Sequence, residues 1–186
     1  VADTYARFFS EVMERTARLI ARWQAVGWAH GVMNTDNMSI LGLTLDYGPF
    51  GFMDDYDAGF ICNHSDHNGR YAFNQQPYIG LWNLSCLAQA LLPLVKKDAL
   101  KAVLESYQPL FDREYLRLMR SKLGLQEERT EDDGLIRDWL SLLQESHADY
   151  TIVFRELGSF SSQESATNDR LREHFANREH FDEWTK

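Results

Sequence analysis

The segment HGVMNTDNMSILGLTLDYG, residues 30–48, carries most of the information about the fold. Before it, apolar residues recur at steps of three and four from Thr4 to about Val26, which predicts an amphipathic helix that stops at Gly27. Within the segment, Met38–Leu45 is rich in apolar residues and predicts a strand. Tyr47–Phe52 predicts a turn followed by a short second strand or loop. We therefore expect a helix, a polar loop and a small β-hairpin in succession.

This order is typical of kinase-like phosphotransferases, in which a catalytic loop H-x-D-x-x-x-x-N precedes a hairpin and a D-x-G sequence. His30 and Asn37 have the matching separation, and Asp46 opens the D-x-G. Val32, however, stands where the catalytic Asp is usual, and an aliphatic side chain cannot accept a proton. Asp36 is the nearest replacement carboxylate, so a standard kinase mechanism is not expected.

Asn37 and Asp46 lie on opposite arms of the predicted hairpin, and closing the hairpin brings their side chains together. An amide oxygen and a carboxylate oxygen can then share one Mg²⁺ and leave its other positions to phosphates and water. The alternative is that Asn34, Asp36 and Asn37 supply only turn and cap hydrogen bonds. The Asp46-Tyr47-Gly48 sequence favours the metal site.

The charge pattern agrees with a cation site. The chain of 186 residues has a net charge of −9, which disfavours sequence-independent binding of DNA or RNA. No Lys or Arg lies between Arg22 and Arg70, and six aspartates fall in that interval: Asp36, Asp46, Asp54, Asp55, Asp57 and Asp66. These carboxylates face water, pair with bases from elsewhere in the fold, such as Arg70, or hold a cation. No membrane span and no signal-like leader can be identified in the sequence.

The rest of the chain is predicted to be a long loop followed by helices. Residues 53–76 form the loop, and Pro77 starts a buried helix in which Trp82 and Cys86 are expected in the core. Cys62, His64 and His67 have a spacing that could suit zinc, but without a fourth ligand the signal is weak and their role stays open. Further helices are expected at about 98–123 (broken or kinked at Pro109), 130–143 with an N-cap at Thr130, 147–157 and 168–184.

The run HGVMNTDNMSILGLTLDYGPFGFMDDYDAGFICNHSDHNGRYAFNQQP closely resembles the selenoprotein O family, called YdiU in bacteria. NTDNMSI and DYGPFGF are its most specific parts, and weaker similarity extends to FDEWTK. The resemblance implies a pseudokinase that transfers AMP from ATP to Ser, Thr or Tyr hydroxyls of proteins and releases pyrophosphate. By this resemblance Asp36 is the catalytic base, Asn37 and Asp46 are Mg²⁺ ligands, and Asp46 also contacts the nucleotide.

The resemblance further implies that this chain is one part of a kinase-like enzyme. The fold class expected is mainly α with a small β-hairpin, the C-terminal lobe of a protein-kinase-like fold that is α+β when intact. We expect residues 1–186 to be a single partial domain that lacks the N-terminal nucleotide-binding lobe and the family's redox-active C-terminal tail. No Gly-x-Gly occurs among the 11 glycines, and all five lysines follow the catalytic loop.

Three functions follow from these features. The first is a magnesium-dependent protein adenylyltransferase, with the fragment alone inactive and prone to self-association. The second is a uridylyltransferase that uses Mn²⁺, and the third is a non-catalytic helical interaction module. The resemblance implies protein substrates, a link to redox stress, and a cytoplasmic location in bacteria or a mitochondrial one in eukaryotes. The acidic charge and the lack of an apolar span predict no nucleic acid or membrane partner.

Overall fold

The computed structural model describes residues 2–161 and 166–186, and 59% of the chain is helical. Its only sheet within these residues is a two-stranded antiparallel one, so the expectation of a mainly helical protein with a small β element is confirmed. The α-helices are α1 Ala2–Ala25, α2 Gln76–Leu91, α3 Lys97–Glu105, α4 Tyr107–Lys122, α5 Asp132–Ser146, α6 Tyr150–Leu157, α7 Ala166–Glu173 and α8 Arg178–Trp184. The strands are β1 Trp28–Ala29 and β2 Gly51–Phe52, and the short 3-10 helices are η1 Thr35–Asn37 and η2 Phe73–Gln75.

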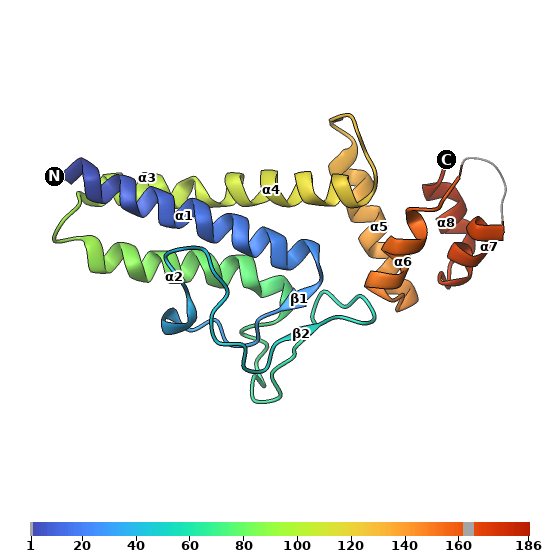
Figure 1. The fold of residues 1–186 in the computed structure, drawn as a ribbon, viewed down its shortest axis with the longest axis horizontal. Coiled ribbons are helices and arrows are strands. Elements are labelled where there is room, and N and C mark those ends of the chain that lie inside the picture. The colour runs from blue at the N-terminus through green and yellow to red at the C-terminus, as the bar shows by residue number, and fades with distance from the viewer. Residues whose placement is uncertain (1, 162–165) are drawn as a thin grey trace. The chain divides into compact units, whose positions relative to one another are not determined.

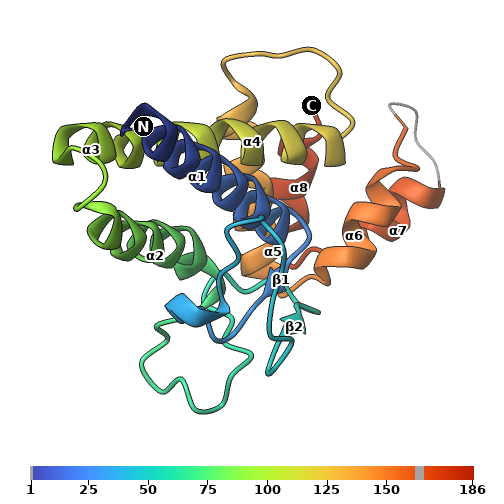
Figure 2. The same cartoon turned by 60° about the vertical axis from the view of Figure 1, so that its left-hand side comes forward.

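The chain forms two compact units. The first contains Val1–Gly51 and Gly59–Tyr115, and the second contains Phe52–Ala58 and Leu116–Lys186. In the first unit α1 lies beside both α2 and α3, and the irregular segments around β1 gather near the C-terminal end of α1 and the N-terminal end of α2 (Figures 1 and 2). These segments hold all the predicted site residues.

Helix α1 matches the sequence prediction. Its apolar face is buried through Phe9, Met13, Ile20 and others, and it ends two residues before Gly27, which has a φ of 68°. A positive φ of this kind is the usual C-terminal stop of a helix because Gly has no Cβ to clash there.

The predicted strand Met38–Leu45 is wrong in detail. Only one antiparallel bridge, Met38 to Thr44, forms within it, and the residues between form a tight turn with Gly42 at a φ of 67°. A Cβ at Gly42 would lie 2.9 Å from the Cβ of Arg15, so the turn packs directly on α1. The second predicted strand does form at Gly51–Phe52, but it pairs with Trp28–Ala29. Because the turn lies in the middle of Met38–Leu45, too few residues remain on either side of it to form a ladder of paired strands.

Helix α2 begins as predicted, with Pro77 in its first turn. The expectation that Trp82 and Cys86 lie in the core is wrong, because Trp82 is 43% exposed and Cys86 is half-buried. The buried face of α2 instead includes Ile79, Gly80 and Asn83. Gly80 is needed there, since a Cβ would lie 2.2 Å from Ile20 Cδ1. This close helix packing rotates Trp82 out to the surface.

The predicted break near Pro109 occurs at Ser106, between α3 and α4. Pro109 itself lies in the first turn of α4, where a missing N–H costs nothing because that N–H has no partner inside the helix. The predicted segment 168–184 is likewise two helices, α7 and α8. Asn177 starts α8 by accepting the N–H of His180 at 3.1 Å.

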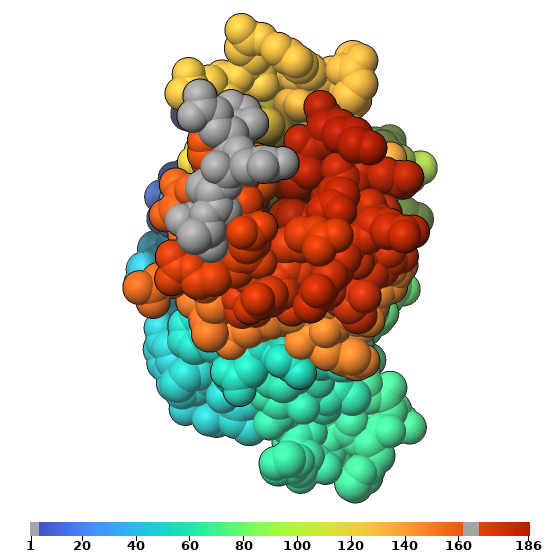
Figure 3. Space-filling view, turned by 90° about the vertical axis from the view of Figure 1, so that its right-hand side faces the viewer, coloured from blue at the N-terminus to red at the C-terminus, as the bar shows by residue number. Residues whose placement is uncertain are grey.

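The second unit has a core of aromatic rings. Trp139 of α5 is fully buried, and the rings of Phe154, Phe175 and Trp184 surround it at centroid distances of 5.9, 5.4 and 4.4 Å. Side chains of α6, α7 and α8 form a continuous orange to red surface in the space-filling view (Figure 3). None of the helices that the structure describes combines the length and apolar character needed to cross a membrane.

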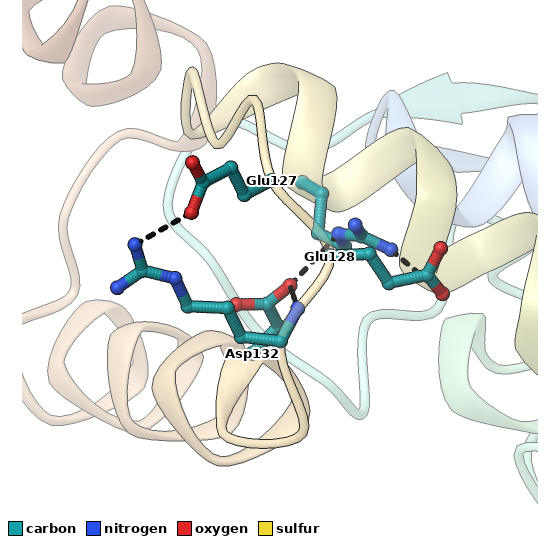
Figure 4. A network of polar contacts seen from close by, with 5 residues as sticks. Glu127, Glu128 and Asp132 are labelled. Atoms are coloured by element: carbon teal, nitrogen blue, oxygen red, sulfur yellow. Dashed lines mark hydrogen bonds and ion pairs between the residues drawn. The ribbon is translucent and has the colours of Figure 1, made fainter.

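A polar network holds the loop before α5 (Figure 4). Arg120 Nε lies 2.8 Å from Asp132 Oδ2, and these side chains are only 12% and 6% exposed. The same oxygen accepts the N–H of Arg129 at 3.0 Å. The prediction of Thr130 as the N-cap of α5 is wrong, because Glu131 takes that position without a capping side-chain hydrogen bond. Asp132 joins the loop to α4 through its ion pair with Arg120.

Replacing Arg120 by Ala is expected to lower the free energy of unfolding by about 3 kcal/mol, because it leaves the buried Asp132 carboxylate without its partner. Thermal or urea unfolding of the chain measures this loss. Arg129→Ala is the matched control, since its ion pair with Glu127 is 68% and 76% exposed and is worth less than about 1 kcal/mol. Equal effects of the two substitutions would contradict the assignment.

Candidate functional site

The segment 30–37 enters the site from β1 through a turn that requires glycine. Gly31 has a φ of 82°, and a Cβ there would lie 2.7 Å from Cys62 Sγ and 2.8 Å from Pro49 O. A side chain at this position would collide with Cys62 and Pro49. The segment then closes into η1, where Asp36 is exposed and Asn37 is half-buried.

His30 is a buried anchor of this segment. Its ring lies 5.4 and 5.6 Å from the rings of Trp23 and Trp28. The Val32 N–H donates to Nδ1 at 3.3 Å, so Nε2 carries the proton and donates to Leu45 O at 2.8 Å. Burial lowers the pKa of His30, although its bond to Leu45 and the charge of Asp46 act in the opposite direction. The ring is therefore neutral at pH 7, and it ties the loop to the residue just before Asp46.

The stability of the chain should fall as the pH drops below about 6.5, because the unfolded chain then binds a proton at this histidine that the folded chain resists. In His30→Gln this part of the pH dependence should disappear. Urea titrations between pH 5 and 8 measure it, with the exposed His64→Gln as control. Identical slopes for wild type and His30→Gln would show that His30 is not responsible.

Side chains from distant segments fix the backbone carbonyls of the loop. Gln76 is fully buried, accepts the His30 N–H at 2.8 Å and donates to Trp28 O at 3.0 Å. Asn63 donates to Gly31 O at 3.2 Å and Asn83 to Met33 O at 2.9 Å. These residues were not predicted from the sequence as part of the site. One feature of the sequence could have indicated them. Gln76 and Asn83 are uncharged polar residues on the face of α2 that is otherwise apolar and buried.

Asn37 and Asp46 lie on the two arms that flank the bridge between Met38 and Thr44. Asn37 Nδ2 donates to Val32 O at 3.1 Å, so its amide oxygen is turned to the other side. The register of the bridge between Met38 and Thr44 places Asn37 opposite Leu45, the residue before Asp46. Thr44 is held in turn by Trp23 Nε1 at 3.1 Å. The two arms that carry Asn37 and Asp46 are thus fixed to each other and to α1.

Asp46 has an unusual backbone. Its φ is 55°, in the left-handed region that residues other than Gly seldom adopt, although Asp and Asn tolerate it best. Its side chain is exposed, and within the described residues neither it nor Asp36 makes a side-chain hydrogen bond or ion pair. The backbone strain at Asp46, together with its unengaged carboxylate, makes it a candidate functional position.

The amide of Asn37 and the carboxylate of Asp46 offer oxygen atoms, which are the donors that a hard cation such as Mg²⁺ prefers. No three His, Cys, Asp or Glu side chains cluster as metal ligands anywhere in residues 2–161 and 166–186. A cation here would accordingly need oxygens from a nucleotide or water. Cys62, His64 and His67 do not form such a cluster either, and Cys62 instead donates to Ala29 O at 3.5 Å.

The six aspartates of the base-free interval are divided between the two units. Asp54, Asp55 and Asp57 belong to the second unit, where Asp55 forms a backbone bridge with Asp149. Asp66 accepts backbone N–H groups. Asp36 and Asp46 are the two aspartates of the 30–48 segment.

Comparison with known proteins gives a match to a family model and matches to curated relatives. The family model described as "Protein adenylyltransferase SelO" matches residues 1–186. The chain is 61% identical over 180 residues to a protein named "Protein nucleotidyltransferase YdiU" from Myxococcus xanthus (strain DK1622). That alignment covers 97% of this chain and 37% of the relative, so the chain spans well under half the length of the protein it resembles.

Proposed function

Since the chain belongs to the SelO family of protein adenylyltransferases, we propose that the full protein transfers AMP from ATP to Ser, Thr or Tyr hydroxyls of other proteins and releases pyrophosphate. The observation that carries this proposal is the pair of unengaged carboxylates, Asp36 and Asp46, on a loop whose backbone is fixed from several sides. Positioning supplies most of the rate in phosphoryl-type transfer, and a preorganised loop is suited to it.

We also propose that the first unit is the C-terminal lobe of a kinase-like fold. The support is the order of its parts: α1, the loop from His30 to Asn37, the bridged turn and Asp46-Tyr47-Gly48. His30 joins the loop to the Asp-x-Gly through its bond to Leu45 O. On this proposal the nucleotide-cradling lobe lies outside residues 1–186.

The chemistry proceeds in one displacement. The acceptor hydroxyl oxygen attacks the α-phosphorus of ATP, the bond from that phosphorus to the bridging oxygen breaks, and pyrophosphate leaves with the electron pair. Asp36 accepts the hydroxyl proton, which Val32 cannot do. Asn37 Oδ1 and the Asp46 carboxylate would hold Mg²⁺, which when bound offsets the charge of the phosphates.

The test uses the full-length protein with ATP labelled at the α- or γ-phosphate, in Mg²⁺ or Mn²⁺, and a protein extract as acceptor. Label that reaches protein from the α-phosphate only supports the proposal. Stronger labelling from UTP with Mn²⁺ would replace AMP transfer by UMP transfer. No labelling from either nucleotide would favour a non-catalytic interaction module. Residues 1–186 alone are expected to transfer little or no label, because half of the proposed site lies outside them.

A further inference from the structure

Arg70 is a lone cation close to the site. It is the only Lys or Arg between Arg22 and Lys96. Its guanidinium carbon lies 4.8 Å from the ring centroid of Trp82 and 5.6 Å from that of Tyr71. In the part of the chain that the structure describes, its side chain makes no ion pair or hydrogen bond, so the pairing with an aspartate suggested by the sequence does not form.

The position of Arg70 is fixed by its neighbours. Asp66 accepts the backbone N–H groups of Arg70 at 2.9 Å and Tyr71 at 2.7 Å. The Tyr71 hydroxyl donates to Asn34 Oδ1 at 2.5 Å. Asn34 is two residues before Asp36, so the loop that carries Arg70 is tied to the segment that carries the proposed base.

Trp82 is tied to the same segment. The next residue in α2, Asn83, is buried and donates to Met33 O. Trp82 is 43% exposed, and Tyr78, one turn earlier on α2, is 67% exposed. Arg70, Trp82 and Tyr78 thus form an exposed cationic and aromatic surface anchored to Met33 and Asn34, which we name the Arg70 platform.

The chemistry of the Arg70 platform suits a carboxylate on a protein. Stacking on the indole covers one face of the guanidinium and leaves its N–H edge for bidentate binding of an acid. Arg, Trp and Tyr are also the residues that contribute most at protein interfaces. Hydrogen bonds from Tyr71 and Asn83, the neighbours of Arg70 and Trp82, tie the platform to Asn34 and Met33. These two residues shortly precede Asp36, the residue that the acceptor hydroxyl must reach. Among the described residues, no hydrogen bond joins the platform to the 44–48 arm that carries Asp46. These contacts favour the acceptor protein over the nucleotide phosphates.

We propose that the Arg70 platform docks the acceptor protein by binding an Asp or Glu side chain close in sequence to the modified hydroxyl. The proposal rests on the proposed function. The first-unit residues between Gly31 and Gly69 include no Lys or Arg but carry Asp36, Asp46 and Asp66. An acidic acceptor is therefore attracted at Arg70 and repelled by these carboxylates, which fixes its register.

The first test compares synthetic Ser peptides that differ only in Glu or Gln at positions flanking the Ser, with full-length protein and α-labelled ATP. Wild type should modify the best Glu peptide about tenfold more efficiently than its Gln counterpart, as expected for a charge-assisted hydrogen bond. Arg70→Gln should remove this preference while the KM for ATP and the rate on the Gln peptide stay unchanged. Arg113→Gln, an exposed arginine on α4, should behave as wild type.

A raised KM for ATP in Arg70→Gln, or an equal loss on both peptides, would overturn the proposal in favour of a phosphate contact. No Glu preference in wild type would also overturn it.

A second test is independent of catalysis: fluorescence anisotropy of a labelled Glu peptide, with its Ser replaced by Ala, should show weaker binding to Arg70→Gln and to Trp82→Leu than to wild type. Failure of transfer with retained, Arg70-dependent binding would reject the proposed function but keep the docking surface.

Discussion

Replacing Asp46 by Asn in the full-length protein should lower nucleotidyl transfer by about 10³-fold, because it removes the anionic ligand of the proposed cation while the nucleotide phosphates are still present. Asn is the informative substitution, since it has nearly the same shape and tolerates the φ of 55° at this position better than Ala does. Transfer of α-labelled AMP at saturating ATP and a range of Mg²⁺ concentrations measures the effect.

The matched control is Asp54→Asn, which removes an exposed carboxylate of the same acidic interval but from the second unit. It should retain wild-type activity. Helical circular dichroism should be unchanged in both variants, because Asp46 makes no side-chain contact that supports a helix. Activity of Asp46→Asn within a few fold of wild type would reject the metal assignment.

Replacing Asp36 by Asn should lower kcat by about 10²- to 10⁴-fold, the range typical of a lost general base. The KM for ATP should change little, because Asp36 is proposed to act on the acceptor hydroxyl. Transfer to one peptide over a range of ATP concentrations separates the effect on kcat from the effect on KM.

Asn34→Ala serves as the comparison for a purely structural role. Asn34 lies two residues before Asp36 and accepts the hydrogen bond of the Tyr71 hydroxyl. The substitution removes this bond but leaves the Asp36 carboxylate in place. We expect a much smaller loss than for Asp36→Asn. If Asp36→Asn and Asn34→Ala gave the same small loss, Asp36 would have only a structural part in the turn.

Much of the fold could be predicted from periodicity. Helix α1 and the start of α2 follow from apolar spacing, Gly27 and Pro77, which act locally and need no tertiary partner. The prediction of a strand at Met38–Leu45 was wrong because these apolar residues form only one bridge and do not pack into the core. Leu41, Leu43 and Leu45 are 58%, 56% and 41% exposed, and hydrophobic pattern alone does not say what covers a residue.

The roles of the site residues stay predictions, but their surroundings explain which of them could be found. Asp36, Asn37 and Asp46 lie within 11 residues of one another, so their spacing is visible in the sequence. Gln76 and Asn83 act on the loop from more than 40 residues away, and only folding brings them to Trp28 O and Met33 O.

By itself, the sequence of this protein determined the helical class, the family and the short-range order of the polar residues from His30 to Gly48. The tertiary structure alone decided that His30 is neutral and bound to Leu45 O, that Trp82 faces outward, and that Arg70 stacks on it without a carboxylate partner among the described residues. The reason is physical. Helix formation and turn geometry depend on neighbours in sequence, whereas burial, desolvation and cation–π contact depend on groups that meet only when distant segments pack.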